Sequence, residues 1–208
     1  MFFDKISSNL KQKWDVLCFG YNEIKENNND ILSCRSHTYS QIGLLDKGEF
    51  RSCFVDLFKT DMMYNVWSRV YNKSFILKYD IKFPSRPIGE DTLFNFQVYR
   101  HLNTILFIDS TLYNYIAGRS GSALTSFHPR RIEIQLAELQ ELHKLLEQFQ
   151  LEDATLMQEI KTKIIISSVF QISNLKLKRQ EKIELLQSII SNKAFENIFS
   201  GNGDQIIG

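Results

Sequence analysis

The sequence predicts an α/β fold followed by an all-helical C-terminal extension, and two patterns carry this prediction. Through residues 1–128, short runs of β-branched and aromatic residues alternate with helical patterns. From residue 129 onward, apolar residues recur every three to four positions, which is typical of amphipathic helices. We therefore expect a mixed sheet with flanking helices in residues 1–128 and helices alone in residues 129–208.

Local signals predict the first elements in order. Residues 1–13 are typical of a short helix, and Val16–Tyr21 is an apolar, β-rich run that indicates a buried strand. An asparagine-rich turn follows and favours a hairpin whose second strand covers Ile31–Ser36. Residues 47–59 place four apolar side chains, three of them phenylalanine, at helical spacing, which predicts an amphipathic helix with a buried face.

The middle of the chain is predicted to consist of shorter elements. We expect a helical turn over Ser74–Lys78, a short edge strand over Ile81–Phe83 and a helix over Glu90–Arg100. Two separate strands are expected at Thr104–Ile108 and Leu112–Ile116. Residues 63–71 fit no single pattern.

Composition narrows the class of function. Hydrophobic residues make up 43% and charged residues 24% of the 208 residues, so the chain can bury a core. The formal net charge of +1 provides no overall field, and nucleic-acid binding is therefore not expected. The termini show no signal peptide and the chain has no long apolar run, so we expect a cytoplasmic protein. Peripheral contact with the inner membrane face is the alternative, through the basic stretch 176–182.

The cysteines indicate a reducing compartment. Cys18, Cys34 and Cys53 are an odd set without a paired spacing, so a disulfide framework is not expected. His37 follows Cys34 by three residues, but a zinc site normally needs two paired ligand motifs. Three buried thiols acting as small hydrophobic side chains are the preferred interpretation.

Two adjacent carboxylates, Glu90 and Asp91, stand where a loop enters a predicted helix. Helix capping is the simpler interpretation, because helix N-termini favour negative charge. The functional interpretation is a general base, which must be rigid and ionised at neutral pH. The helix dipole is expected to lower the pKa of Asp91 and so to weaken it as a base.

Three further features could form a ligand site. Trp67 precedes the carboxylates and could bind the apolar face of a sugar ring, although packing in the core on one helical face with Tyr71 is the simpler interpretation. After the pair Tyr113 and Tyr115, a polar loop could hold a phosphate. The alternative for this loop is a solvated turn. Its candidate ligands are Arg119, Ser120 and Ser122, with His128 as a candidate metal ligand.

In their order along the chain, these features resemble bacterial family 2 glycosyltransferases of the GT-A type. The resemblance is specific over residues 61–128 and extends loosely back to Trp14. It is carried by Trp67–Tyr71, Phe83–Pro84, Gly89–Asn95, Ile108–Asp109, Leu112–Tyr115 and Arg119–Ser122. It implies a partial GT-A sheet, the acceptor-side portion of an enzyme that transfers a sugar with inversion in surface or capsular polysaccharide or glycoconjugate synthesis.

The resemblance also implies roles for individual residues. Asp91 would deprotonate the acceptor hydroxyl, Glu90 would support it, and Trp67 would line the acceptor pocket. The loop residues Arg119, Ser120 and Ser122 would lie near the donor diphosphate, and His128 would be a metal ligand. Its partners would be a nucleotide-sugar donor and a saccharide or lipid-linked acceptor.

The chain departs from the family in one respect. The family holds a divalent metal, Mn or Mg, through an Asp-x-Asp motif, and this sequence contains no such motif and no glycine-rich phosphate loop. We therefore expect that the donor-binding half is missing and that the chain is inactive alone. We also expect that a sheet edge is exposed, where a second copy or an upstream partner half could bind. A non-catalytic interaction module or one subunit of a split transferase is the alternative.

Overall fold

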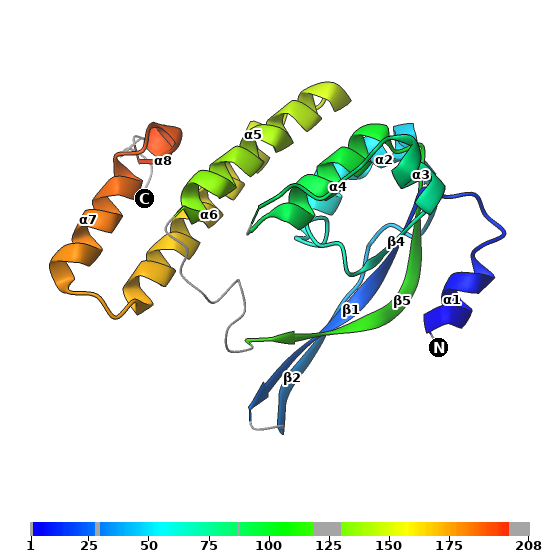
Figure 1. Ribbon diagram of the computed structural model, residues 1–208, viewed down its shortest axis with the longest axis horizontal. Helices are drawn as coiled ribbons and strands as arrows, with labels where there is room; N and C mark the ends of the chain where they lie inside the picture. The colour runs from blue at the N-terminus through cyan, green and yellow to red at the C-terminus, as the bar shows by residue number, and fades with distance from the viewer. Residues whose placement is uncertain (1, 28–29, 87, 119–129, 200–208) are drawn as a thin grey trace, which may run out of the picture.

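The protein has an α/β fold, as predicted: a five-stranded mixed sheet with helices, continued by further helices (Figure 1). The structure is a computed structural model that describes residues 2–27, 30–86, 88–118 and 130–199. The strands are β1 (Val16–Asn27), β2 (Asp30–His37), β3 (Gly43–Asp46), β4 (Arg69–Tyr71) and β5 (Thr104–Ala117). The helices are α1 (Phe2–Ser8), α2 (Lys47–Lys59), α3 (Lys73–Lys78), α4 (Glu90–His101), α5 (Arg131–Phe149), α6 (Ala154–Asn174), α7 (Arg179–Ile190), the 3₁₀ turn η1 (Lys193–Phe195) and α8 (Glu196–Phe199).

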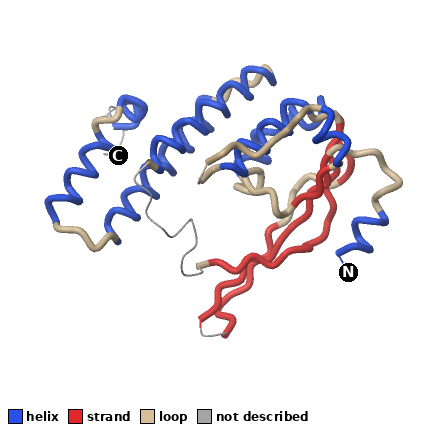
Figure 2. The backbone as a smooth tube through the Cα atoms, viewed as in Figure 1, coloured by secondary structure: helices blue, strands red, loops and turns tan. Residues whose placement is uncertain are grey.

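The sheet has the order β2-β1-β5-β3, with β4 paired to β1. Strands β1 and β5 run parallel, whereas β2 and β4 run antiparallel to β1, and β3 antiparallel to β5. The far halves of β1 and β5 extend with β2 as a curved ribbon beyond the helices (Figure 2). Among the described residues β2 and β4 each pair with β1 alone, and β3 pairs with β5 alone.

A break in the pleat of β1 sets which side chains face the helices. Val16 and Cys18 contribute to the main core, and after irregular pairing around Gly20 the side chain of Tyr21 packs against that same core. Gly20 is needed there because a Cβ would lie 2.5 Å from the His37 carbonyl oxygen. Without this bulge the strict two-residue alternation would turn Tyr21 to the opposite face.

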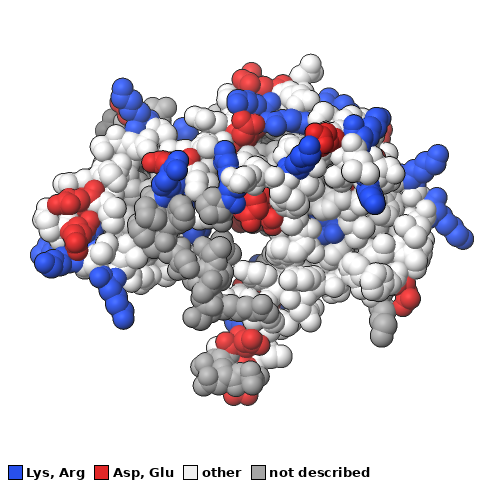
Figure 3. Space-filling view, viewed as in Figure 1, with Lys and Arg blue, Asp and Glu red and all other residues white. Residues whose placement is uncertain are grey.

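Charge is spread over the surface without a large patch of one sign on the face shown in Figure 3, in keeping with the net charge of +1. Within the residues that the structure describes, no helix has both the length and the apolar character needed to cross a bilayer.

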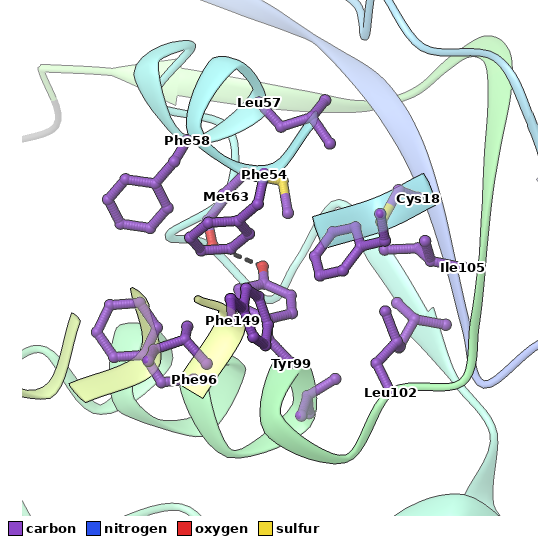
Figure 4. Close-up of a cluster of buried hydrophobic side chains, with 14 of the residues drawn as sticks. Cys18, Phe54, Leu57, Phe58, Met63, Phe96, Tyr99, Leu102, Ile105 and Phe149 are labelled. Atoms are coloured by element: carbon purple, nitrogen blue, oxygen red, sulfur yellow. Dashed lines mark hydrogen bonds between the residues drawn. The ribbon is translucent and has the colours of Figure 1, made fainter. Parts of the chain in front are cut away.

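One core joins the sheet, α2, α4 and the first helix of the extension (Figure 4). The three phenylalanines of α2 that were predicted to be buried are 0 or 1% exposed: Phe50, Phe54 and Phe58. The Phe54 ring lies 5.3 Å from that of Phe149 on α5, and the Tyr99 hydroxyl donates to the Met63 carbonyl oxygen at 2.8 Å. The extension therefore shares the main core with the α/β part. A further cluster, Ile164, Ile172, Ile189 and Phe195, joins α6, α7 and η1.

The other face of the sheet carries a smaller cluster of Trp14, Leu17, Phe19 and Leu106, against which Ile6 of α1 packs. Because these four side chains are at most 8% exposed, the short N-terminal helix suffices to cover the middle of this face.

Several local predictions are confirmed. Helix α2 has the predicted bounds, the β1–β2 hairpin forms, and α4 extends the predicted helix by one residue. The capping box of Asp46 with Glu49 explains the start of α2, because each side chain accepts a hydrogen bond from the other's backbone.

Other predictions are wrong. Residues 81–83 form no strand, because the Ile81 N–H donates to the Ile76 carbonyl oxygen and closes α3, while the exposed Phe83 stacks on Phe94. The two strands expected after α4 are one strand, β5, because its pairing with β1 continues through Thr111. The predicted helical face shared by Trp67 and Tyr71 does not exist, since a turn leads directly into β4.

The cysteine prediction is correct in part. All three thiols are free, Cys18 is buried and Cys53 partly buried. Cys34, however, is exposed on β2, whose residues lie on a hairpin with solvent on both faces.

Candidate functional site

Five aromatic rings gather on the helix-facing side of the sheet, and we call them the aromatic platform: Tyr21, His37, Trp67, Tyr113 and Tyr115. His37, Tyr21 and Tyr113 are register partners across β2, β1 and β5, so their side chains form one row. Trp67 lies parallel to Tyr115 with ring centroids 5.3 Å apart, and 4.8 Å from Tyr113. Its ring meets Tyr21 edge-on at 4.7 Å, and Tyr21 stacks on His37 at 4.6 Å.

The platform is open to solvent. Tyr113 is 42% exposed and the other four side chains are partly buried. Tyr71 packs against the main core, as expected, but Trp67 belongs to none of the core clusters. Packing in a core cluster therefore does not explain Trp67, whose partly buried ring packs against the other rings of the platform.

Asp91 is attached to the loop that carries the tryptophan. The backbone N–H of Val66 donates to Asp91 Oδ2 at 3.4 Å, and Val66 immediately precedes Trp67. Burial raises the pKa of Asp91, and the charge of Glu90 raises it further, against the Val66 N–H and Arg69, which lower it. The predicted lowering of the pKa is therefore wrong, because burial outweighs the hydrogen bond from the Val66 N–H and the charge of Arg69.

Neither carboxylate caps α4. The N-cap residue is Gly89 in the left-handed region, with φ 76°, and it offers no side-chain hydrogen bond. The capping interpretation of Glu90 and Asp91 is thus wrong, because the cap lies one residue earlier and has no side chain. The pair occupies the first turn of the helix, where a rigid backbone holds the Asp91 carboxylate beside Val66.

Residues 60–68, between α2 and β4, carry Trp67, and we call them the tryptophan loop. Polar contacts fasten this loop to its neighbours. Asn95 of α4 donates from Nδ2 to the carbonyl oxygens of Tyr64 and Asn65, both at 2.9 Å, and accepts from the Tyr71 hydroxyl at 2.7 Å. Arg69, which is only 6% exposed, donates to the Met62 carbonyl oxygen at 2.8 Å. Our sequence reasoning assigned Arg69 no role. The sequence did offer one signal for a structural role of Arg69, which is its position as a charged residue within a short, largely apolar run.

A third carboxylate, Glu138 of α5, lies beneath the start of α4. A Cβ added to Gly89 would overlap the Glu138 carboxylate. Burial raises the pKa of Glu138 to about 7, although Arg86 and Arg131 act to lower it. Sequence reasoning missed this residue. The signal was a glutamate between the apolar positions Leu136 and Leu139 of a helix.

The position of Glu138 predicts a pH-dependent stability effect. Because the folded state raises its pKa from 4.5 to about 7, the fold loses stability as the pH rises from about 4.5 to about 7, and the cost disappears at low pH, where Glu138 is protonated in both states. Replacing Glu138 with glutamine is expected to raise the free energy of unfolding by about 1–3 kcal/mol at about pH 8 and to leave it unchanged near pH 4. Urea titrations at the two pH values measure this, and an equal effect at both would contradict it.

Gly89 offers a second prediction with a matched control. A Gly89→Ala variant is expected to lose about 1–3 kcal/mol of unfolding free energy, because alanine is strained at a positive φ and its methyl group displaces Glu138. Gly118→Ala has nearly the same φ, 78°, with no atom within 4 Å of the added Cβ. Thermal unfolding of the two variants separates backbone strain from the collision, and equal losses would show that Glu138 yields without cost.

The remaining predicted site residues lie outside the described part of the chain. These are Arg119, Ser120, Ser122 and His128. Within the described ranges, no group of three His, Cys, Asp or Glu side chains is arranged to hold a metal ion.

The structure thus joins Asp91, in the first turn of α4, to the segment that carries Trp67 through the Val66 N–H. This arrangement offers aromatic rings on which a ligand ring can stack and a carboxylate of raised pKa that can accept a proton. No protein-family model matches this chain, and no curated protein matches it in sequence.

Proposed function

We propose that this chain binds the saccharide acceptor of an inverting, family 2-like sugar transferase, and that Asp91 deprotonates the reacting hydroxyl. One observation carries the proposal: the Asp91 carboxylate accepts a hydrogen bond from the residue next to Trp67. This hydrogen bond ties the proposed base on α4 to the segment that carries the proposed ring-binding residue Trp67. Surface or capsular polysaccharide and glycoconjugate synthesis are the processes that use such acceptors.

The chemistry follows from the two parts of the site. The apolar face of a sugar ring stacks on Trp67, which leaves its hydroxyls at the ring edge facing polar groups. Asp91 takes the proton as the hydroxyl oxygen attacks the anomeric carbon of a nucleotide-sugar, and the nucleoside diphosphate leaves from the opposite side. The raised pKa of Asp91 makes the carboxylate a stronger base, and the charge of Glu90 helps to raise it.

The sequence resemblance alone supports the part of the proposal that concerns the nucleotide-sugar donor. Arg119, Ser120 and Ser122 would contact the diphosphate, with His128 as a ligand of the divalent metal, Mn or Mg. When bound, that metal would neutralise charge on the leaving diphosphate. The described residues contribute acceptor binding and proton removal.

The unpaired side of β4 suggests a second candidate, one subunit of a split transferase or a non-catalytic interaction module. Three residues of this strand, Arg69–Tyr71, pair with β1 on one side and with no described strand on the other, where a partner's strand could add. Such an assembly would keep the platform as its acceptor surface. A platform that binds no saccharide in an isolated, folded chain would favour the interaction module.

Tryptophan fluorescence tests the proposal directly, because the chain has two tryptophans and Trp14 is only 8% exposed. In a Trp14→Phe background Trp67 is the sole reporter, and titration with neutral hexoses and their disaccharides is expected to change its emission with saturation. Calorimetry of a Trp67→Ala variant is expected to show affinity lower by about 5–30-fold, the value of one lost ring contact.

Phe83→Ala is the control, since Phe83 is an exposed aromatic residue that lies off the platform, and it is expected to leave affinity unchanged. If no saccharide alters Trp67 emission or gives a calorimetric signal, the acceptor proposal fails.

A further inference from the structure

A cavity of about 280 Å³ lies between α2, α4, α5 and α6. Its floor is apolar and includes Phe58, Phe96 and Leu142, each at most 2% exposed. The floor is closed from α6 by Ile160 and Ile164. This volume is at the small end of ligand pockets, which suits one ring-sized group better than a nucleotide.

Polar groups line the remaining wall of the cavity. Gln135 and Glu138 reach it from α5, Tyr64 from the tryptophan loop and Ser167 from α6. The Gln135 Oε1 atom is buried without a hydrogen-bond donor among the described residues. A buried acceptor in this state is costly, and a ligand that brings a hydroxyl or amide donor relieves the cost.

The cavity adjoins the proposed acceptor site. Asp61 and Tyr64 line it, and the same segment continues to Val66 and Trp67. On α4 the residue after Asp91, Thr92, lines the cavity as well. At its margin Asp61 and Lys163 form an ion pair of 2.9 Å between the end of α2 and α6. A ligand in the cavity would therefore lie next to one on the platform.

We propose that this cavity binds one saccharide unit of the acceptor, adjacent to the unit stacked on the aromatic platform. The inference rests on the proposed function and adds that the acceptor has at least two sugar units. A sugar ring offers an apolar face to the Phe58 and Phe96 rings and hydroxyl donors to Gln135 and Glu138.

Two other ligand classes fit less well. A hydrocarbon chain would leave the Gln135 amide oxygen and the Glu138 carboxyl group without partners. An anionic group would meet the carboxylates Asp61 and Glu138 as well as the cations Arg131 and Lys163, so the lining has no net positive charge to hold it. A neutral hydroxylated ring matches both the floor and the polar wall.

Calorimetry tests this with pairs of ligands: glucose with maltose and cellobiose, and N-acetylglucosamine with chitobiose. For at least one pair the wild-type chain is expected to bind the disaccharide about ten-fold more tightly than its monosaccharide, from added hydrogen bonds in the cavity. Gln135→Leu removes the buried acceptor, and Ser167→Phe fills the cavity from α6. Both variants are expected to lose the disaccharide gain while keeping monosaccharide affinity and the Trp67 fluorescence response.

Gln140→Leu is the control, because Gln140 is exposed on the same helix and does not line this cavity. It is expected to keep the full gain. Circular dichroism confirms that each variant is folded. If monosaccharides bind but disaccharides show no gain, or both folded cavity variants retain the gain, this inference is overturned and the proposed function stands. If no saccharide binds at all, both are overturned.

Discussion

A Phe54→Ala variant is expected to lose about 3–5 kcal/mol of unfolding free energy, which would leave a typical domain marginally folded. Phe54 is 0% exposed, and its ring contacts those of Phe50, Phe58 and Phe149 with centroids 5.3–5.6 Å apart. Alanine would remove the ring from the centre of the core and leave a cavity that rigid neighbours cannot fill. Urea denaturation followed by circular dichroism measures the loss.

Because Phe149 belongs to the helical extension, the same experiment tests whether the extension folds with the sheet. One cooperative transition is expected for the wild type, and Phe54→Ala should shift all of it. Phe3→Ala is the control, since Phe3 is 80% exposed and its loss should change stability by less than about 0.5 kcal/mol. Two separate transitions, with only one shifted, would show that α5 and the sheet unfold independently.

An Asp91→Asn variant is expected to lower sugar transfer by about 10²–10⁴-fold while the fold stays intact. Asparagine keeps an oxygen that can accept from the Val66 N–H, so the loop geometry is retained and only proton acceptance is lost. The measurement is the turnover rate of the chain together with the proposed donor-binding partner half, a nucleotide-sugar and an acceptor. Asp109→Asn, an exposed carboxylate on β5, is the control.

The pH profile gives an independent check on Asp91. A base acts only when ionised, so activity should fall as the pH falls through its pKa, and burial places that limb above the ordinary range for aspartate. Glu90→Gln removes a charge that raises this pKa and should move the limb to lower pH. Retention of wild-type turnover in Asp91→Asn would exclude this residue as the base.

Predictions from sequence succeeded where the structure depends on neighbours along the chain. The bounds of α2 follow from the capping box at Asp46 and the apolar spacing of its phenylalanines, both of which are local. The single strand β5 could not be predicted, because Asp109 and Thr111 are polar, and the strand continues past them only where Thr111 and the residues from Tyr113 onward pair with β1. A weak edge strand was predicted at residues 81–83 because its apolar run gave no sign of the turn that closes α3.

The candidate site divides in the same way. Trp67, Glu90 and Asp91 could be selected from residue type and order along the chain, and the structure joins Asp91 to the segment that carries Trp67 through the Val66 N–H. Tyr21 and His37 belong to the platform because of the strand register and the bulge at Gly20. No local sequence pattern predicts either of these features. The pKa of Asp91 was predicted in the wrong direction because its burial depends on the fold.

The parallel pairing of β1 with β5 has a consequence for how the chain is made. The hairpin of β1 and β2 leaves the ribosome early, but Ile105, the partner of Val16, follows only after α2, β4, α3 and α4. At ordinary rates of synthesis the free edge of β1 waits roughly 5–20 seconds for that partner. During this time Leu17 and Phe19 lack the β5 residue Leu106 that later packs with them, so the nascent chain has a defined interval in which chaperones can protect it from aggregation.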